Sequence, residues 1–305
     1  MSATTHYLPV GQRHSDAKLL FRFLVGPMGW MHVLAIGGLF VFEARPIDWI
    51  VCATLYFVRM FGVTGGYHRY FSHRTYKTSR AFQFVLAFLA QSSSQMGALW
   101  WASHHRVHHK ESDTDRDVHS PIKRSFLYSH ILWIFDDNLE TDYEKIRDMA
   151  KYPELVFLNI YWWVPPLVLG FGTWLVLGWS GLFVGFFLST VLLWHGTFTI
   201  NSLSHVFGYQ DYESGDESKN NWVLALVTMG EGWHNNHHYY QASTRQGFVW
   251  WQVDVTYYVI KALELVGLVW DVREPPKEVV AGKRKLSHTQ RAKGSANDGG
   301  GQAAA

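Results

Sequence analysis

The sequence predicts an all-α integral membrane protein with four transmembrane helices and a histidine-rich polar part on one side of them. Three observations predict this fold class. Charge-free apolar runs alternate with polar blocks, so the chain of 305 residues has a mean hydropathy of only −0.07. The polar blocks hold 25 of the 27 Lys and Arg residues. Histidine, with 17 residues, is in excess and gathers in short clusters.

Composition excludes several classes of protein. With 15 Trp, 15 Tyr and 20 Phe, the chain has too many aromatic residues to be disordered over most of its length. A formal net charge of +2, without a stripe of Lys and Arg among aromatic residues, gives no field for a polyanion, so nucleic acid is not expected as a partner. The one cysteine, Cys52, excludes an internal disulfide, a zinc ribbon and a four-thiolate iron–sulfur cluster.

Four segments are suited to cross a bilayer, which takes about 20 apolar residues. Residues 23–42 contain no charged side chain, and residues 49–67 contain only Arg59. Because a charge at mid-bilayer is costly, we expect Arg59 to snorkel or to pair near the polar block. The 56 residues from 155 to 210 are charge-free, enough for two spans joined at the Gly-Trp-Ser-Gly turn of residues 178–181. The predicted spans are therefore residues 23–42, 49–67, 155–178 and 181–200.

The basic residues orient these spans. With four spans, the polar blocks before residue 23, between residues 67 and 155, and after residue 210 all lie on the same side of the membrane. The positive-inside rule makes that side cytoplasmic. Both termini are therefore expected in the cytoplasm, and we favour a bacterial inner membrane over the endoplasmic reticulum as the location.

The domain organisation follows from the same pattern. We divide the chain into a cytoplasmic N-terminal segment (residues 1–22), a membrane-bound domain (residues 23–272) and a basic, disordered tail (residues 273–305). Two stretches inside the domain are not counted as spans. Residues 81–103 have a polar Gln-Ser-Ser-Ser-Gln centre, so we expect a re-entrant or interfacial hairpin, or buried helices. Residues 248–270 mix charged and aromatic residues, which indicates an amphipathic helix at the interface.

Three histidine clusters flank the predicted spans. On a helix, residues at positions i, i+3 and i+4 share a face, so two of the clusters each present three imidazoles in one direction. His68 and His73 follow the second span, and Asn201 and His205 form an i, i+4 pair after the fourth. The two helical clusters are His105, His108, His109 and His234, His237, His238.

Nine imidazoles in such clusters indicate a metal site. An unsatisfied buried polar group costs roughly 1–3 kcal/mol, and protonated neighbours would repel one another. Neutral imidazole is the commonest metal ligand among side chains, and nine exceed the four ligands of a tetrahedral zinc site. We therefore expect two metal ions on the cytoplasmic side of the spans.

Several motifs resemble those of the membrane-bound fatty acyl desaturases, most closely the stearoyl-CoA (Δ9) desaturase-like group. The resemblance covers about residues 20–272 and rests on five stretches. They are His-Arg-Tyr-Phe-Ser-His-Arg-Thr-Tyr (68–76), His-Arg-Val-His-His-Lys (105–110), Asp-Val-His-Ser (117–120), Asn-Ser-Leu-Ser-His-Val-Phe-Gly (201–208) and Gly-Glu-Gly-Trp-His-Asn-Asn-His-His (230–238).

The resemblance implies four transmembrane helices beneath a helical cytoplasmic cap, with a di-iron centre as the active site. It implies an oxidoreductase of lipid metabolism that uses O2 and two electrons to introduce a cis double bond, at Δ9, into a saturated acyl chain. No catalytic side chain beyond the metal centre is implied. Carried over position by position, the implied iron ligands are His68, His73, His105, His108, His109, His205, His234, His237 and His238, with Asn201 acting through a water.

Five further residues receive expected roles around this centre. The resemblance places Trp101 and Trp194 at a tunnel for the acyl chain. Glu231, Asp113 and Asp117 are candidates to accept hydrogen bonds from the ring N–H groups of the ligands and so orient them.

The carrier of the acyl chain stays open between CoA and a membrane lipid. Acyl-CoA members of the family carry an Arg-Asp pair before the second histidine box and an Arg-Lys pair after a Ser-His-x-x-Trp stretch. Here these positions hold Ser103-His104 and Asp136-Asp137, and two acids would repel the CoA phosphates. Lys123 and Arg124 can partly substitute for the missing basic residues. On the resemblance alone, CoA stays slightly ahead of a membrane lipid as the carrier.

The electrons are expected from another protein. The sequence contains no cytochrome b5 His-Pro-Gly-Gly motif and no Gly-x-Gly-x-x-Gly motif after a strand, and it has too few cysteines for an iron–sulfur cluster. We therefore expect no intrinsic heme, flavin or iron–sulfur cluster. The expected donor is of the cytochrome b5, ferredoxin or rubredoxin type, with a reductase.

Two alternative functions stay open at this point. A di-iron membrane hydroxylase uses similar clusters but produces an alcohol in place of an alkene. A heme-binding or metal-transporting membrane protein needs histidines paired within spans, whereas the clusters here lie at or beyond the span ends. His32 and His195 do lie within spans, and we expect them to be packed or bonded to the helix backbone.

Overall fold

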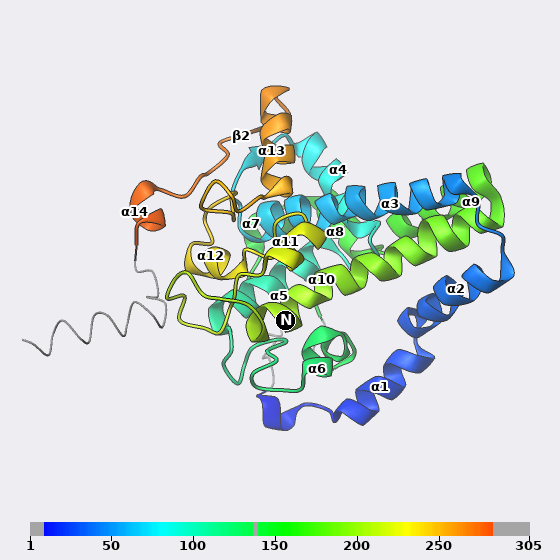
Figure 1. Cartoon of the computed structure of the whole chain (residues 1–305), viewed down its shortest axis with the longest axis horizontal. Coiled ribbons are helices and arrows are strands. Elements are labelled where there is room, and N and C mark those ends of the chain that lie inside the picture. The colour runs from blue at the N-terminus through cyan, green and yellow to red at the C-terminus, as the bar shows by residue number, and fades with distance from the viewer. Residues whose placement is uncertain (1–8, 137–139, 283–305) are drawn as a thin grey trace, which may run out of the picture.

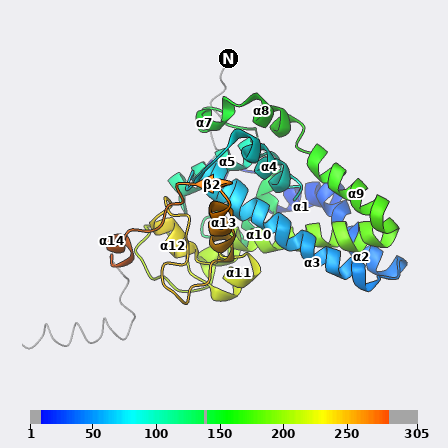
Figure 2. The same cartoon turned by 90° about the horizontal axis from the view of Figure 1, so that it is seen from above.

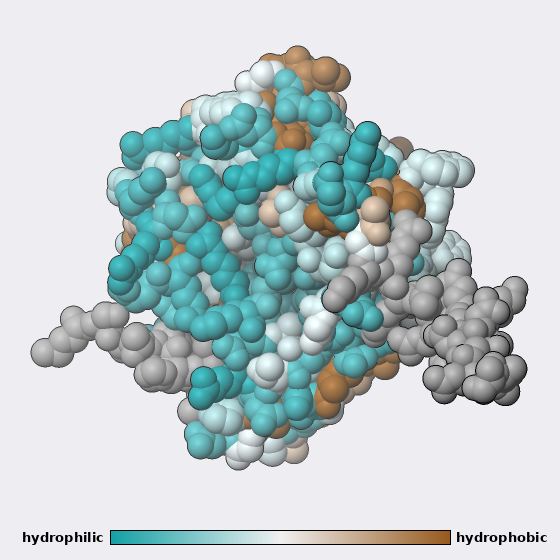
Figure 3. Space-filling view, turned by 90° about the vertical axis from the view of Figure 1, so that its left-hand side faces the viewer, coloured by the Kyte–Doolittle hydropathy of each residue, from teal (hydrophilic) through white to brown (hydrophobic). Residues whose placement is uncertain are grey.

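The computed structural model describes residues 9–136 and 140–282, which are predominantly helical. Long helices extend together toward one end of the molecule, and shorter helices gather as a cap at the other end (Figure 1). Seen from above, α2, α3 and α9 again lie on one side, with α12 and α14 on the other (Figure 2). The cap end presents a mostly hydrophilic surface (Figure 3). The predicted mainly helical fold is confirmed.

The first apolar segment is a bent pair of helices. After the short η1 (Val10–Gln12), α1 (Asp16–Val25) ends at Gly26 and α2 (Pro27–Val41) begins at once. The two axes differ by 58°. Proline at the first position of a helix lacks the N–H that would continue the preceding helix, so the chain turns there. The span predicted for residues 23–42 therefore includes the end of α1 and contains a bend at Gly26.

The second apolar segment is longer than residues 49–67. α3 (Pro46–Phe61) continues without a break into the π-helical η2 (Gly62–Ser72), and the whole is long and apolar enough to cross a membrane. Arg59 is fully buried in it and donates to Thr190 Oγ1 at 2.6 Å and Ser189 Oγ at 2.5 Å. This guanidinium is therefore held by hydroxyl groups of the helix bundle. The sequence did not suggest these partners.

The third apolar segment begins with a separate short helix, α8 (Pro153–Ile160). Val164–Val206 then forms α9 (Val164–Ser180), η4 (Gly181–Leu188) and α10 (Ser189–Val206). Gly178 breaks this stretch with φ 71° and ψ −159°, a conformation that glycine adopts without a Cβ clash. The chain turns back at this break, from α9 into η4, near the far end of the molecule (Figure 1).

Within the described residues, two helices could cross a membrane by length and composition, Pro46–Ser72 and Val164–Val206, and the bent α1–α2 pair would be a third. The four separate spans that the sequence predicted are not established by this criterion, because Val164–Val206 counts once. Large apolar side chains are nevertheless exposed along these elements, for example Phe40 at 85% and Val176 at 80%. Such a surface is suited to lipid.

The cap consists of short elements between and after the long helices. Side-chain caps start several of them, with Ser79, Ser125, Asn221 and Asp254 accepting hydrogen bonds from backbone N–H groups of the first turns. The elements are β1 (Lys77–Thr78), α4 (Arg80–Gln91), α5 (Ala98–Glu111), α6 (Phe126–His130), η3 (Leu132–Phe135), α7 (Arg147–Ala150), α11 (Trp222–Val227), α12 (His234–Tyr239), α13 (Val255–Leu265), β2 (Val269–Trp270) and α14 (Lys277–Val280). β1 and β2 pair antiparallel.

Two sequence expectations for the cap change in detail. Residues 81–103 form parts of α4 and α5, and the buried Gln91, the last residue of α4, donates to the Leu158 carbonyl at 3.0 Å. The helix expected over residues 248–270 covers only Val255–Leu265. Asp254 caps the start of this helix, α13, and β2 follows it in the chain.

The first part of the predicted C-terminal tail packs on the cap. Residues 273–282 are described, and Tyr212 donates to the Val280 carbonyl at 2.9 Å, which holds α14 against the cap. The rest of the predicted tail, residues 283–305, and residues 1–8 of the N-terminal segment lie outside the described residues.

Candidate metal centre

Four parts of the chain bring the nine clustered histidines together. His68 lies on η2 and His73 directly after it, while the second cluster lies on α5. His205 ends α10, and the third cluster occupies the six-residue α12. Glycine lets the first of these elements, η2, pack closely on α4, because a Cβ at Gly62 would lie 3.0 Å from the Ala90 backbone.

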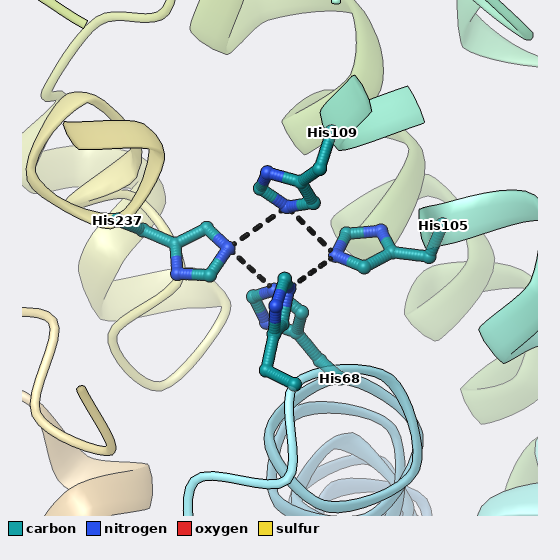
Figure 4. A group of neighbouring side chains, drawn as sticks. His68, His105, His109 and His237 are labelled. Carbon is teal, nitrogen blue, oxygen red and sulfur yellow. Dashed lines mark hydrogen bonds between the residues drawn. The ribbon is translucent and has the colours of Figure 1, made fainter. Parts of the chain in front are cut away.

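The rings form two groups. In the first, His68, His73, His105, His109 and His237 offer ligand atoms within 4.8 Å of one another. The rings drawn in Figure 4 point toward a common centre. The Nε2 atoms of His68 and His237 are 2.9 Å apart, as are those of His73 and His105. His109 lies 3.0 Å from both His105 and His237 by the same atoms.

The second group consists of His108, His205, His234 and His238, again within 4.8 Å of one another. Nε2 of His205 lies 3.1 Å from Nε2 of His234. Nε2 of His108 and Nε2 of His238 are buried and have no hydrogen-bond partner among the described residues. Because such orphaned buried nitrogens are costly, they indicate a ligand at this point.

Each group is held from behind by carboxylates. Asp117 lies 2.8 Å from Nδ1 of His108, and Asp113 lies 2.9 Å from Nδ1 of His205. Glu231 contacts Nδ1 of His68. A carboxylate accepts only, so each Nδ1 carries the proton and each Nε2 keeps a lone pair directed into the group. All three acids expected to orient rings therefore lie in positions to do so.

A fourth carboxylate was missed by the sequence reasoning. Asp216 lies 2.5 Å from Nδ1 of His238 and accepts from Ser218 Oγ at 2.6 Å. It belongs to a polar loop with several acids. Only the folded structure distinguishes it from the neighbouring acids, because its partner His238 is distant in sequence. His119, in one of the motifs quoted above, also joins His108 and Asp117 in a third group of potential ligands.

Electrostatics favour the neutral form of five of these histidines, whereas Asp117, against the effect of burial, raises the pKa of His108. Burial, with repulsion from neighbouring imidazoles, holds the pKa of His73, His105, His109, His234 and His237 well below its ordinary value. Neutral imidazoles with inward lone pairs are the form that metals bind.

The carboxylates, in contrast, are charged. Burial opposes ionisation of Glu231, but His68 and Arg69 outweigh it and lower the pKa of Glu231 to about 2. The pKa of Asp117 is likewise lowered, because the attraction of His108 overcomes its burial. A shell of negative charge around neutral rings favours a bound cation, so the donor set fits metal ions.

A largely apolar cavity of about 610 Å³ adjoins the first histidine group. His105, Trp101, Trp194 and Asn201 all line it. The Trp101 ring stacks on His105 with centroids 4.7 Å apart, and Trp194 Nε1 donates to the Ser93 carbonyl at 2.8 Å. The two tryptophans expected at a tunnel thus form walls of this cavity.

Three other histidines form a chain beside the cavity. His32 Nδ1 donates to the Met28 carbonyl at 2.7 Å, as expected of a helix-bonded histidine. Its Nε2 lies 3.0 Å from Nε2 of His195, whose Nδ1 lies 2.9 Å from Nε2 of His130. The sequence reasoning did not single out His130, and it did not link His32 with His195.

Asp136, one of the positions compared with CoA-binding residues, is already engaged within the protein. Asp136 is buried, accepts from Tyr128 Oη at 3.0 Å and lies 3.0 Å from His14 Nδ1. Asp137 lies outside the described residues. The two cations that could substitute are paired with acids: Lys123 with Asp115 at 3.3 Å and Arg124 with Asp16 at 2.7 Å.

Comparison with known proteins gives a consistent result. Residues 44–264 match the family model described as fatty acid desaturase. The chain is 38% identical over 270 residues to an acyl-CoA 5-desaturase of Anemone leveillei, covering 85% of this chain and 81% of that one. It is 37% identical over 251 residues to the sn-1 stearoyl-lipid 9-desaturase of Anabaena variabilis, covering 80% of this chain and 92% of that one. It is also 36% identical over 264 residues to the chloroplastic palmitoyl-monogalactosyldiacylglycerol delta-7 desaturase of Arabidopsis thaliana, covering 85% and 70%.

Proposed function

The chain belongs to the fatty acid desaturase family, as its motifs predicted, and from this premise we propose that it introduces a cis double bond, at Δ9, into a saturated acyl chain at a di-iron centre. Its relatives are named desaturases, so it is an oxidoreductase of lipid metabolism. The Δ9 position is supported by the sn-1 stearoyl-lipid 9-desaturase among them.

The observation that carries the proposal is the pair of histidine groups. His68, His73, His105, His109 and His237 would hold one ion, and His108, His205, His234 and His238 the other, with Asn201 acting through a water. Imidazole also suits zinc, copper and nickel, so the identity of the metal follows from the reaction. Bound iron would supply the activation of O2 that removal of hydrogen from an unactivated methylene group demands.

The chain's own residues position the reaction. Asp113, Asp117 and Glu231 fix the ring orientations through Nδ1, and Asp216 does the same for His238. The apolar cavity receives the acyl chain and excludes water, which limits side reactions of a strong oxidant. Trp101 forms the wall where the cavity meets His105.

The reaction balances with O2, two electrons and two protons, giving the alkene and two waters. The electrons come from outside, through a cytochrome b5, ferredoxin or rubredoxin type of donor with its reductase. We place four spans in the bilayer by counting α1–α2, Pro46–Ser72, and the two arms that meet at Gly178. The cap and both termini then face the cytoplasm, in a bacterial inner membrane.

Expression in a desaturase-deficient host tests the activity. Gas chromatography of the fatty acids should show a monounsaturated product, and fragmentation of its dimethyl disulfide adduct should place the double bond at Δ9. Accumulation of a hydroxy acid without alkene would favour the hydroxylase alternative, and a strong Soret band in the purified protein would favour heme. A double bond elsewhere would overturn the assigned position alone.

A ligand variant tests the metal centre. His237→Ala should accumulate in the membrane, lose desaturation and hold less iron than the wild type by elemental analysis. Lys110→Ala, an exposed residue next to His109 on α5, is the matched control and should keep both. Unchanged turnover in His237→Ala would show that this ring is not a required ligand.

A further inference from the structure

The cavity reaches the outer, apolar flank of the molecule between two helix breaks, and we propose that acyl chains enter it sideways from the bilayer while esterified to a membrane glycerolipid. The inference rests on the proposed desaturase function and names its substrate class. It concerns the route and the carrier, which the histidine groups do not determine.

The wall of the cavity has a buried part and an exposed part. His105 and Trp101 belong to the part beside the histidine groups. Pro27, Trp163 and Leu167 also line it, and all three are exposed, Leu167 at 60%. A space lined by both kinds of residue connects the candidate metal centre with the surface of the long helices.

The exposed part lies at two breaks in candidate membrane segments. Pro27 begins α2 at the 58° bend after α1, and Trp163 stands at the start of α9, after α8 has ended. The exposed residues around these breaks are apolar, including Val25 at 57% and Ile160 at 57%. Such a rim belongs in lipid, and tryptophan is typical of the level where lipid meets water.

The charges around this opening do not suit CoA. Its phosphates require Arg or Lys forks for recognition. Among the described residues that line the cavity, none is Asp, Glu, Lys or Arg. Arg22, on α1, donates to the carbonyl of the lining residue Phe135 at 2.8 Å, and Asp136, the next residue, adds negative charge. Lys123 and Arg124 are paired with acids.

A glycerolipid avoids this difficulty. Its headgroup stays at the interface, where water and other headgroups solvate it, and only the acyl chain needs to leave the bilayer. The transfer exchanges one apolar environment for another, so no phosphate has to be desolvated. The apolar rim and the uncharged cavity are therefore sufficient for a lipid-linked chain.

Reconstituted protein distinguishes the two carriers. The iron-loaded full chain is placed in nanodiscs with ferredoxin, its reductase, NADPH and O2, with a cyanobacterial acyl-lipid desaturase as a positive control for the donor. Labelled stearoyl chains are supplied either in phosphatidylcholine of the disc or as stearoyl-CoA. We expect the lipid-linked label to be desaturated at least about tenfold faster, equivalent to about 1.4 kcal/mol. Equal or faster turnover of stearoyl-CoA would overturn the inference but leave the desaturase function standing.

If neither label were desaturated with ferredoxin, cytochrome b5 or rubredoxin as the donor, each shown to work with a control desaturase of its own, the proposed function itself would fail, and this inference with it. The two failures are therefore distinguishable.

A matched pair of variants tests the lateral route. Leu167 lines the cavity, whereas its neighbour Val168 is similarly exposed on α9 and is not among the lining residues. Leu167→Trp should lower lipid desaturation about tenfold, or about 1.4 kcal/mol, while Val168→Trp stays near the wild type. Stearoyl phospholipid that copurifies with iron-free protein, measured by mass spectrometry, should fall in Leu167→Trp alone. Equal behaviour of the two variants in both measurements would contradict entrance at this place.

Discussion

His238 and Asp216 are joined by a 2.5 Å contact between Nδ1 and a carboxylate oxygen, although they lie 22 positions apart in the sequence. Asp216 is only one of several acids in its loop, yet it holds a histidine whose Nε2 is buried and has no hydrogen-bond partner in the described part of the chain. The attraction of His238, against the opposing effect of burial, keeps the pKa of Asp216 well below its usual range. The carboxylate is therefore charged at every pH at which the enzyme is expected to work.

This contact predicts that Asp216→Ala weakens metal binding, although Asp216 is not itself a proposed ligand. Loss of a carboxylate behind a metal-binding histidine typically costs about 10- to 100-fold in metal affinity or activity. Iron per chain and desaturation should both fall, with the chain still inserted. Glu213→Ala, an exposed acid of the same loop, is the control and should match the wild type. Full iron content in Asp216→Ala would show that His238 does not need this partner.

Removal of the metal should destabilise the protein. Without ions, the neutral rings of the two groups face one another with too few protons to satisfy every Nε2. A ligand at 100 times its dissociation constant stabilises the folded state by about 2.7 kcal/mol. Treatment with a chelator should therefore lower the melting temperature by several degrees, and anaerobic Fe²⁺ should restore it. A melting temperature that does not respond as iron is removed would contradict the assignment.

Much of the candidate site could be predicted because its chemistry is local. The spacings of His105, His108 and His109, and of His234, His237 and His238, appear within single short helices, and the fold brings both faces together. Glu231, Asp113 and Asp117 stand close to histidines in the chain or in its motifs. The mainly helical fold and the family were predicted for similar reasons, since apolar runs and motifs are continuous in sequence.

The remainder depends on contacts between distant residues. Nothing near Arg59 indicates that Ser189 and Thr190 will receive its guanidinium, and nothing in the Asp216 loop indicates His238. The bend at Gly26–Pro27 was overlooked because hydropathy measures length and not direction. A glycine-proline pair inside a charge-free run is the signal that could have predicted it.

Arg69 predicts a contrast between buried and exposed ion pairs. It is fully buried and bonds Glu231 and Asp254, each at 2.9 Å. Arg69→Met leaves two buried carboxylates without their cation, which typically costs 3–5 kcal/mol, so we expect about that loss of stability. Because Glu231 also holds His68, iron binding should fall as well.

The control is the exposed pair of Arg80 and Glu154, whose N–O distance is 2.7 Å. Solvent screens this pair, so Arg80→Met should barely change the melting temperature. Thermal unfolding of both variants in the same detergent measures the difference. If the melting temperature fell equally in the two variants, burial would not be the reason that the Arg69 ion pairs stabilise the protein.

The chain of His32, His195 and His130 predicts a structural effect that is separable from the metal centre. The Met28 carbonyl can only accept, so His32 donates to it from Nδ1, and its Nε2 accepts from His195. His195 in turn accepts at Nδ1 from His130. Burial lowers the pKa of His130 to about 4, so this ring stays neutral at physiological pH.

Replacement of the central ring breaks both bonds. His195→Leu should cost about 1–3 kcal/mol for each partner left unsatisfied, measured as a lower melting temperature, while iron content stays at the wild-type level. Leu192→Ala, an exposed position of the same helix, should change neither quantity. Because none of the three rings belongs to the groups that could hold metal, a loss of iron in His195→Leu would mean that the chain supports the metal centre and does more than hold α2 and α6 against α10.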